Sequence, residues 1–200
     1  PPPPLFFYPH NPAYEMLRSL VGSEMCIRDR DDTELETLFD LYVSGLEEIS
    51  QDPLIHDNKV RVQVVGRKEL LPNRVLDAIK KAEEATSKYS DFLFTVCLAY
   101  GGREEIVDAV KEIAEAHASG EIELDSIEPS TISNRLYTAD LPDPDLVIRT
   151  SGEERVSNFL LWQIAYSELY FSDVHWPSFG RRDLYEAIED YQMRRRRYGG

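Results

Sequence analysis

The stretch FLFTVCLAY, residues 92–100, is apolar over nearly its whole length and is followed by Gly101 and Gly102. A short, continuous apolar run that ends at glycine is typical of a strand that is covered on both faces. Two further runs have the same character, VRVQVVG at 60–66 and DLVIR at 145–149. We expect these three segments to be strands of one sheet.

Segments with a helical spacing of apolar residues alternate with these strands. The spacing predicts helices over about 35–46, 73–88, 104–118, 158–166 and 181–196. Strands that alternate with helices are joined by right-handed crossovers and therefore lie parallel. The predicted fold class is α/β, a parallel β-sheet flanked by helices on both faces.

Composition limits the partners that the chain can have. With 22 basic and 37 acidic residues among 200, the net charge is −15. Such an acidic surface repels nucleic acid, so any anion site has to be local and built from a few placed arginines. The sequence shows no apolar stretch of the roughly 18 to 20 residues that span a bilayer, and no secretory signal. We therefore expect a cytoplasmic protein without a nucleic-acid partner.

Residues 1–30, PPPPLFFYPHNPAYEMLRSLVGSEMCIRDR, differ from the rest of the chain. Four prolines lead into an aromatic cluster, and no helical or strand period follows. The string YEMLRSLVGSEMCIRDR resembles translated sequencing-adapter read-through. The predicted organisation is therefore a non-native or disordered leader over 1–30 and one folded domain over 31–200. A natural flexible tail is the alternative interpretation of the leader.

The segment RTSGEERVS, residues 149–157, leaves the predicted strand DLVIR. In open α/β sheets, ligands bind beyond the carboxyl ends of the strands. Arginine matches phosphate oxygens bidentately and hydroxyl groups can donate to the remaining ones, so Arg149, Arg155 and Ser157 are candidate phosphate-binding residues. Ser157 is also placed to cap the expected helix after it. The alternative is a surface loop in which the arginines pair with Glu153 and Glu154.

Glu168 lies in the otherwise apolar run that follows. A carboxylate in such a context has to be paired, protonated or bound to a cation. Mg²⁺ binds one or two carboxylates together with phosphate oxygens, which makes Glu168 a candidate metal ligand beside the arginine loop. A structural salt bridge, for instance to one of the arginines, is the alternative.

The block PDPDLVIRTSGEERVSNFLLWQIAYSELYFSDVHWPSF, residues 142–179, resembles the signature of the cis-prenyltransferases, the undecaprenyl and dehydrodolichyl diphosphate synthases. The resemblance extends back through AYGGREEIVDAV at 99–110 and forward to the closing RRYGG, and it covers about residues 33–200. It implies a parallel sheet flanked by helices, in agreement with the pattern above.

The resemblance also implies roles for individual residues. Arg149, Arg155 and Ser157 match residues that hold the diphosphate of isopentenyl diphosphate. Glu168 matches a carboxylate that helps to place Mg²⁺. Arg197 and Gly199 match the family's Arg-x-Gly motif, which reaches into the site of the neighbouring subunit of a homodimer. From the residues alone, Arg194 to Arg197 are a basic helix end.

One part of the family pattern is not found in this sequence. The family opens with a strand that leads into an Asp-Gly-Asn-x-Arg loop, which binds the allylic diphosphate, and a later Phe-Ser-x-Glu-Asn-Trp-type segment also contributes to the site. Neither is present. We therefore expect this chain to be the C-terminal part of the domain, without the N-terminal strand or strands and the phosphate loop, and to be inactive as it stands.

The function that the resemblance implies is repeated cis-condensation of isopentenyl diphosphate onto a farnesyl or geranylgeranyl diphosphate primer. It would need Mg²⁺, act as a homodimer and work in the cytoplasm, in peripheral contact with the membrane that receives the long product. A non-catalytic partner subunit of a heteromeric cis-prenyltransferase is one alternative. The retained diphosphate-binding residues disfavour it. A plain phosphate-binding α/β module is another, and it would not need the SNFLLWQ block or the terminal motif.

Overall fold

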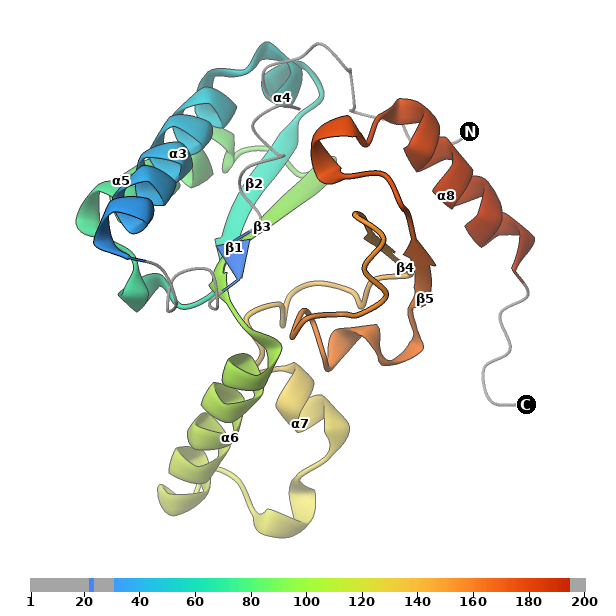
Figure 1. Ribbon diagram of the computed structural model, residues 1–200. Coiled ribbons are helices and arrows are strands. Elements are labelled where there is room, and N and C mark those ends of the chain that lie inside the picture. The colour runs from blue at the N-terminus through green and yellow to red at the C-terminus, as the bar shows by residue number, and fades with distance from the viewer. Residues whose placement is uncertain (1–21, 24–30, 195–200) are drawn as a thin grey trace.

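The structure, a computed structural model, describes residues 22–23 and 31–194 (Figure 1). In chain order its helices and strands are β1 (Gly22–Ser23), α3 (Asp32–Gln51), α4 (Pro53–Asp57), β2 (Val60–Val65), α5 (Asn73–Thr86), β3 (Phe92–Tyr100), α6 (Gly102–Ala118), α7 (Pro129–Ser133), β4 (Leu146–Arg149), β5 (Glu168–Phe171) and α8 (Arg181–Met193). Single 3₁₀ turns lie at Lys68–Leu70, Leu124–Ser126, Gln163–Tyr166 and Trp176–Ser178.

All strand pairs of the described chain are parallel. The first sheet has the order β1-β3-β2, with β2 in register with β3 from Val60 opposite Phe92 to Val65 opposite Cys97. The second sheet is the pair β4-β5. The expected α/β fold with parallel strands and helices is confirmed. The described strands form two sheets where one was expected, because DLVIR, as β4, pairs with β5 and not with β2 or β3.

The core lies between β2, β3 and the two helices α3 and α5, which pack together on one side of these strands (Figure 1). Asp31 starts α3 because its carboxylate accepts hydrogen bonds from the backbone N–H groups of Thr33 and Glu34, at 3.0 and 2.9 Å. The buried residues share an apolar character and a helical or alternating spacing: Phe39, Tyr42, Leu46, Ile49, Val62, Val64, Leu71, Val75, Ala78, Ile79, Ala82, Val96, Leu98 and Ala99.

The segments that carry the candidate site lie on the opposite side of β2 and β3 (Figure 1). There β4 and β5 stand side by side and α8 packs against β5, while α6 projects from the carboxyl end of β3. Gly102 allows the start of α6 to approach the later chain closely, since a Cβ atom at this position would lie 3.0 Å from Leu161. The two glycines after β3 therefore end the strand and make room for a contact across the molecule.

The prediction of a helix over 158–166 is wrong. Residues 157–162 form turns, and only Gln163–Tyr166 form a 3₁₀ turn. Ser157, Asn158 and Leu160 have φ values of +47°, +62° and +46°, in the left-handed region, which no right-handed helix contains. An apolar run indicates burial without fixing the backbone, and the tertiary contacts of Asn158 described below decide its course. Strand β5 lies in the same apolar run, and the pattern did not distinguish it from a helix for the same reason.

Two residues of the leader are among those that the structure describes. Gly22 and Ser23 form β1, which pairs with the carboxyl half of β3 opposite Leu98 and Tyr100. Backbone pairing with a strand edge needs no apolar side-chain pattern, so the sequence gives no signal for it. Among residues 22–23 and 31–194, none of the helices combines the length and the apolar character that crossing a bilayer requires.

Candidate anion-binding site

The chain that leaves β4 folds into a strained loop over residues 150–160. Ser151 and Gly152 follow one another with φ values of +72° and +67°, and three more residues of the loop, at 157, 158 and 160, are also left-handed. Non-glycine residues in this region are held there by surrounding contacts and cluster at functional sites. The backbone N–H groups of Ser151 and Gly152 donate to the carbonyl oxygens of Val174 and Ser172, both at 2.9 Å, which fixes the turn.

Arg149, the last residue of β4, carries a donor without an acceptor. Its guanidinium Nε is buried and has no hydrogen-bond partner among the described residues. Buried donors are nearly always satisfied, and an orphaned one leaves a desolvation cost unbalanced. A guanidinium N–H donor without a partner, at the carboxyl end of a strand, suits an anionic ligand whose oxygen accepts the missing hydrogen bond.

Arg155 and Ser157 lie on the solvent side of the same loop. The side chain of Arg155 is 66% exposed and forms an ion pair with Glu153, which is the surface pairing considered as an alternative above. Within the described part of the chain, Arg149 forms no ion pair with either glutamate. Ser157 is exposed and caps no helix, because no helix begins there. Both residues remain accessible to a ligand, and their role in phosphate binding stays a prediction.

Asn158 attaches the loop to α6. Its side-chain oxygen accepts from the backbone N–H of Arg103 at 2.9 Å, and its carbonyl oxygen accepts from Gly102 N–H at 2.7 Å. Its amide nitrogen donates to Glu104 at 2.9 Å. Asn158 thus satisfies free N–H groups in the first turn of α6 and joins the segments that follow β3 and β4. This role of Asn158 is not predicted in the sequence analysis. The one signal for it is the glycine pair at the start of α6, which has no side chain that could cap the helix.

A buried carboxylate, Glu105, forms a second connection between α6 and the later chain. It is fully buried. One oxygen accepts from the Tyr137 backbone N–H at 2.8 Å, and the other accepts from the Tyr100 hydroxyl and, at 3.1 Å, from the Gln163 amide. Burial, followed by this hydrogen bond to Glu105, raises the pKa of Tyr100. The sequence block AYGGREEIVDAV contains Glu105, but its pattern alone does not mark a buried acid.

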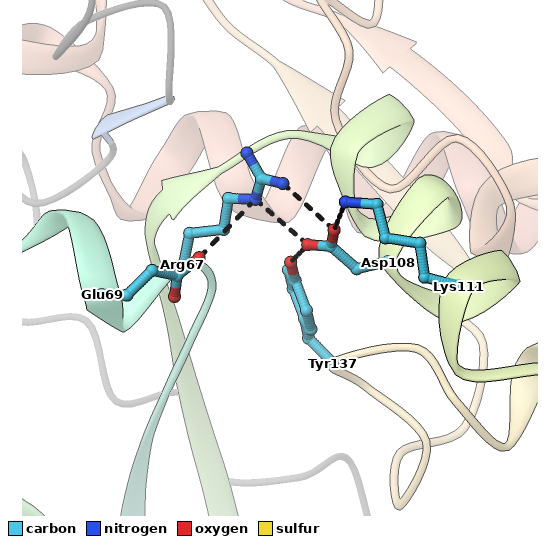
Figure 2. Close-up of polar contacts among 5 residues, drawn as sticks. All are labelled: Arg67, Glu69, Asp108, Lys111 and Tyr137. Carbon is cyan, nitrogen blue, oxygen red and sulfur yellow. Dashed lines mark hydrogen bonds and ion pairs between the residues drawn. The ribbon is translucent and has the colours of Figure 1, made fainter. Parts of the chain in front are cut away.

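Figure 2 shows a third connection, centred on Asp108 of α6. Arg67, which follows β2, donates to both carboxylate oxygens at 3.1 Å, and Tyr137 donates its hydroxyl at 2.5 Å. Lys111 adds a contact at 3.3 Å and Glu69 lies 3.8 Å from Arg67. The hydrogen bonds from Arg67 are the main cause that holds the pKa of Asp108 at about 2. This cluster fixes α6 to the end of β2 and to the segment before β4.

Replacing Asp108 by Asn should reduce stability in a pH-dependent way. In the folded chain the pKa of the Asp108 carboxyl is lowered to about 2, from an ordinary value of about 3.9. At pH values above the pKa of the unfolded chain, the carboxylate therefore contributes on the order of 2 kcal/mol to the free energy of unfolding. That contribution is lost as the pH falls from about 4 towards 2. Urea unfolding of wild type and Asp108→Asn at pH 7 and pH 3 should therefore show a difference that shrinks at pH 3. A difference of equal size at both pH values would contradict the assignment, and Tyr137→Phe serves as a control that leaves the Arg67 pair intact.

Glu168 lies away from the arginine loop. It is the first residue of β5 and stands opposite Leu146, whereas Arg149 stands opposite Phe171. Three residues of a strand correspond to about 10 Å, so the two predicted site residues lie at opposite ends of the β4-β5 pair. The structure does not bring Glu168 beside the loop as the sequence-based expectation had it.

The partner of Glu168 is Arg194, which follows α8. Arg194 Nη1 donates to Glu168 Oε2 and to the Leu169 carbonyl oxygen, both at 2.9 Å, and its Nε donates to Asp190 at 2.8 Å. The hydrogen bonds that Arg194 donates to Glu168 and then to Asp190 raise the pKa of Arg194. The salt bridge considered as the alternative for Glu168 therefore exists. Arg197 and Gly199 lie outside the described residues.

The residues near Glu168 fit a Mg²⁺ ion only if water molecules and phosphate oxygens supply its other ligands. The Glu168 side chain is 28% exposed, and Oε1 has no partner among the described residues. The described residues contain no group of three His, Cys, Asp or Glu side chains that could hold a metal ion. One free carboxylate oxygen suits an ion that keeps its waters and binds phosphate oxygens as well, which is the usual chemistry of Mg²⁺.

Comparison with known proteins places this geometry in a family. Residues 27–199 match the family model described as "Putative undecaprenyl diphosphate synthase". The tritrans,polycis-undecaprenyl-diphosphate synthase (geranylgeranyl-diphosphate specific) of Methanopyrus kandleri is 53% identical over 171 residues, which are 86% of this chain and 63% of that protein. The protein of the same name from Methanocaldococcus jannaschii is 52% identical over 172 residues, 85% of this chain and 61% of that protein. The chain thus spans a little over three fifths of the length of these relatives.

Two solved structures have the same fold. The lavandulyl diphosphate synthase of Lavandula x intermedia, determined in complex with dimethylallyl diphosphate, superposes with a TM-score of 0.84 at 29% identity and covers 94% of this chain and 86% of that one. A probable undecaprenyl diphosphate synthase from Campylobacter jejuni superposes with a TM-score of 0.78 at 26% identity, covering 96% and 94%.

Proposed function

This chain belongs to the undecaprenyl diphosphate synthase family, and from that premise we propose that it serves the cis-condensation of isopentenyl diphosphate onto an allylic diphosphate. The observation that carries the proposal is the buried, unpartnered Nε of Arg149 at the carboxyl end of β4. A diphosphate supplies acceptor oxygens for this donor, with Arg155 and Ser157 as further contacts from the same loop. No covalent intermediate is needed, because positioning and electrostatic stabilisation of the leaving diphosphate supply the catalysis.

The primer that we propose is geranylgeranyl diphosphate. The support is that the Methanopyrus and Methanocaldococcus relatives, at 53% and 52% identity, both carry that specificity in their names. The catalytic type of subunit is favoured over a non-catalytic partner because Arg149, Arg155, Ser157 and Glu168 are all present.

The test is chain elongation with radiolabelled isopentenyl diphosphate. Since the chain spans 63% of the Methanopyrus relative, residues 31–200 are joined to an amino-terminal segment with the Asp-Gly-Asn-x-Arg loop that the family resemblance leads us to expect. We expect long cis-polyprenyl products, made faster with geranylgeranyl than with farnesyl diphosphate. A folded chimera that binds both substrates and yields no polyprenyl product would favour the partner-subunit alternative.

We infer that the reaction depends on Mg²⁺. The metal would neutralise the diphosphate charge, and Glu168 would offer it one carboxylate oxygen. Removal of the ion with a chelator should abolish elongation by the chimera, and Mg²⁺ addition should restore it.

The long product leaves for a membrane, so we place the enzyme in the cytoplasm, in peripheral contact with that membrane. Co-sedimentation with phospholipid vesicles checks the contact.

We propose a homodimer with a shared site, because Arg197-Tyr198-Gly199, which lies outside the described residues, matches the Arg-x-Gly motif of the family. Deleting 197–200 should cripple elongation by the chimera while each subunit stays folded. Mixing this deletion with an Arg149→Ala subunit should restore part of the activity, because one of the two sites in the heterodimer regains every component. Absence of recovery in fully exchanged heterodimers would assign the motif to its own subunit.

A further inference from the structure

The loop segment 153–157 contains two of the predicted diphosphate-binding residues, Arg155 and Ser157. Inside this segment, Arg155 pairs with Glu153. In the part of the molecule that the structure describes, no hydrogen bond or ion pair joins the segment to a residue outside 150–160. The place of its side chains is therefore set by the attachments at its two ends.

The two attachments differ in what they require. The one before the segment is made by the backbone N–H groups of Ser151 and Gly152, which donate to the chain that follows β5, so it needs no particular side chain. The one after the segment is made by Asn158. Two of its contacts with α6 use the side chain: the oxygen accepts from the Arg103 N–H and the amide nitrogen donates to Glu104, both at 2.9 Å.

Asparagine suits this position, and the start of α6 is shaped to receive it. The φ of Asn158 is +62°, in the left-handed region that Asn adopts more readily than most residues, and its amide offers both an acceptor and donors. A Cβ atom at Gly101 would lie 2.9 Å from Asn158 Nδ2, and one at Gly102 would lie 3.1 Å from the Asn158 carbonyl oxygen. The two glycines and Asn158 are therefore complementary parts of one contact.

We propose that Asn158 is a positioning residue for the binding of isopentenyl diphosphate. Its bonds to Arg103 and Glu104 hold the end of the loop, and the loop in turn presents Ser157 and Arg155 to the diphosphate. A loop that is already ordered loses less conformational freedom when the ligand binds, so the affinity falls when these bonds are removed. The inference rests on the proposed function, because it concerns the same site.

The test exchanges the donor and the acceptor of one contact without changing its shape. Asn158→Asp keeps an acceptor for the Arg103 N–H but places a second carboxylate beside Glu104. We expect its affinity for isopentenyl diphosphate to be about tenfold lower than that of wild type, measured by calorimetric titration. Adding Glu104→Gln to the same chain supplies an amide donor from the other side, and most of the affinity should return. Wild-type affinity in Asn158→Asp, or a loss that Glu104→Gln does not reverse, would overturn the inference.

A second measurement asks whether Asn158 acts through the loop. In a chain that already carries Ser157→Ala and Arg155→Ala, the residues that Asn158 positions are absent. Asn158→Asp should then change the affinity by less than about twofold, because the effects of coupled residues do not add. A tenfold loss in this background would contradict the positioning role.

Two control variants separate positioning from stability and from net charge. Asp108→Asn weakens a different contact of α6, so it should lower the stability and leave the affinity unchanged. Arg182→Ala makes the net charge more negative by one, as Asn158→Asp does, at an exposed residue of α8 that pairs with Glu186. If either control weakens binding as much as Asn158→Asp, the inference fails.

Hydrogen exchange of the ligand-free chain tests the same role without isopentenyl diphosphate. The backbone N–H groups of residues 153–157 should exchange faster in Asn158→Asp and return to the wild-type rate when Glu104→Gln is added. Unchanged exchange in Asn158→Asp would show that Asn158 does not fix the segment. The proposed function fails separately, if the wild-type chain does not bind isopentenyl diphosphate while the exchange rates respond as expected.

Discussion

Replacing Arg149 by Ala should weaken the binding of isopentenyl diphosphate by roughly ten- to a hundredfold, which corresponds to about 1.5–3 kcal/mol for one charge-assisted hydrogen bond. The physical reason is the buried Nε, which has no acceptor among the described residues and gains one only from the ligand. Isothermal titration of wild type and mutant with isopentenyl diphosphate measures the effect.

Two further variants make this prediction specific. Arg149→Lys keeps the charge but not the planar fork of donors, so it should recover only part of the affinity. Arg155→Ala should cost less than Arg149→Ala, because Arg155 is 66% exposed and already paired with Glu153. Equal affinity in wild type and Arg149→Ala would show that the diphosphate binds elsewhere.

Replacing Glu105 by Ala should destabilise the fold by about 3 kcal/mol or more, since each buried donor that loses its acceptor costs about 1–3 kcal/mol. Three donors depend on this carboxylate: the Tyr100 hydroxyl, the Tyr137 backbone N–H and the Gln163 amide. Urea unfolding followed by circular dichroism gives the free energy of unfolding.

Glu105→Gln tests the same network without a change of shape. Both carboxylate oxygens act as acceptors, so the amide NH₂ group of Gln must face one of the three donors, and we expect a smaller loss of about 1–3 kcal/mol. Glu112, an exposed residue of the same helix, is the control, and Glu112→Ala should change stability by no more than about 0.5 kcal/mol. Equal stabilities of the Glu105 and Glu112 variants would remove Glu105 from the core network.

The parts of the fold with a strong local period were predictable from the sequence. Strand β3 at Phe92–Tyr100 coincides with the predicted 92–100, and α5 at Asn73–Thr86 ends two residues before the predicted limit. Helix α5 buries one apolar face, as its spacing indicates. Strand β3 is buried mainly over its carboxyl half, whereas Leu93 near its start is 45% exposed, so the expected cover on both faces does not extend over the whole strand. The signature block likewise identified Arg149 at the end of its strand.

The rest depends on contacts between residues far apart in the chain. Asn158 takes a left-handed backbone because its carbonyl and side chain serve the first turn of α6, about 55 residues earlier, and no local pattern contains that information. Glu105 is buried because Tyr100, Tyr137 and Gln163 converge on it. The register of β4 and β5, which separates Glu168 from Arg149, is set by strand pairing and cannot be inferred from the spacing of the two residues.

If Arg149 holds the diphosphate, its removal should change which ligand the protein prefers. The affinities of wild type and Arg149→Ala are measured for isopentenyl diphosphate and for isopentenyl monophosphate, which differ by one phosphate group. We expect that wild type prefers the diphosphate and that the preference falls at least tenfold in Arg149→Ala, while Arg182→Ala retains it. The same preference in wild type and Arg149→Ala would contradict the claim, because the second phosphate would then be recognised without this guanidinium.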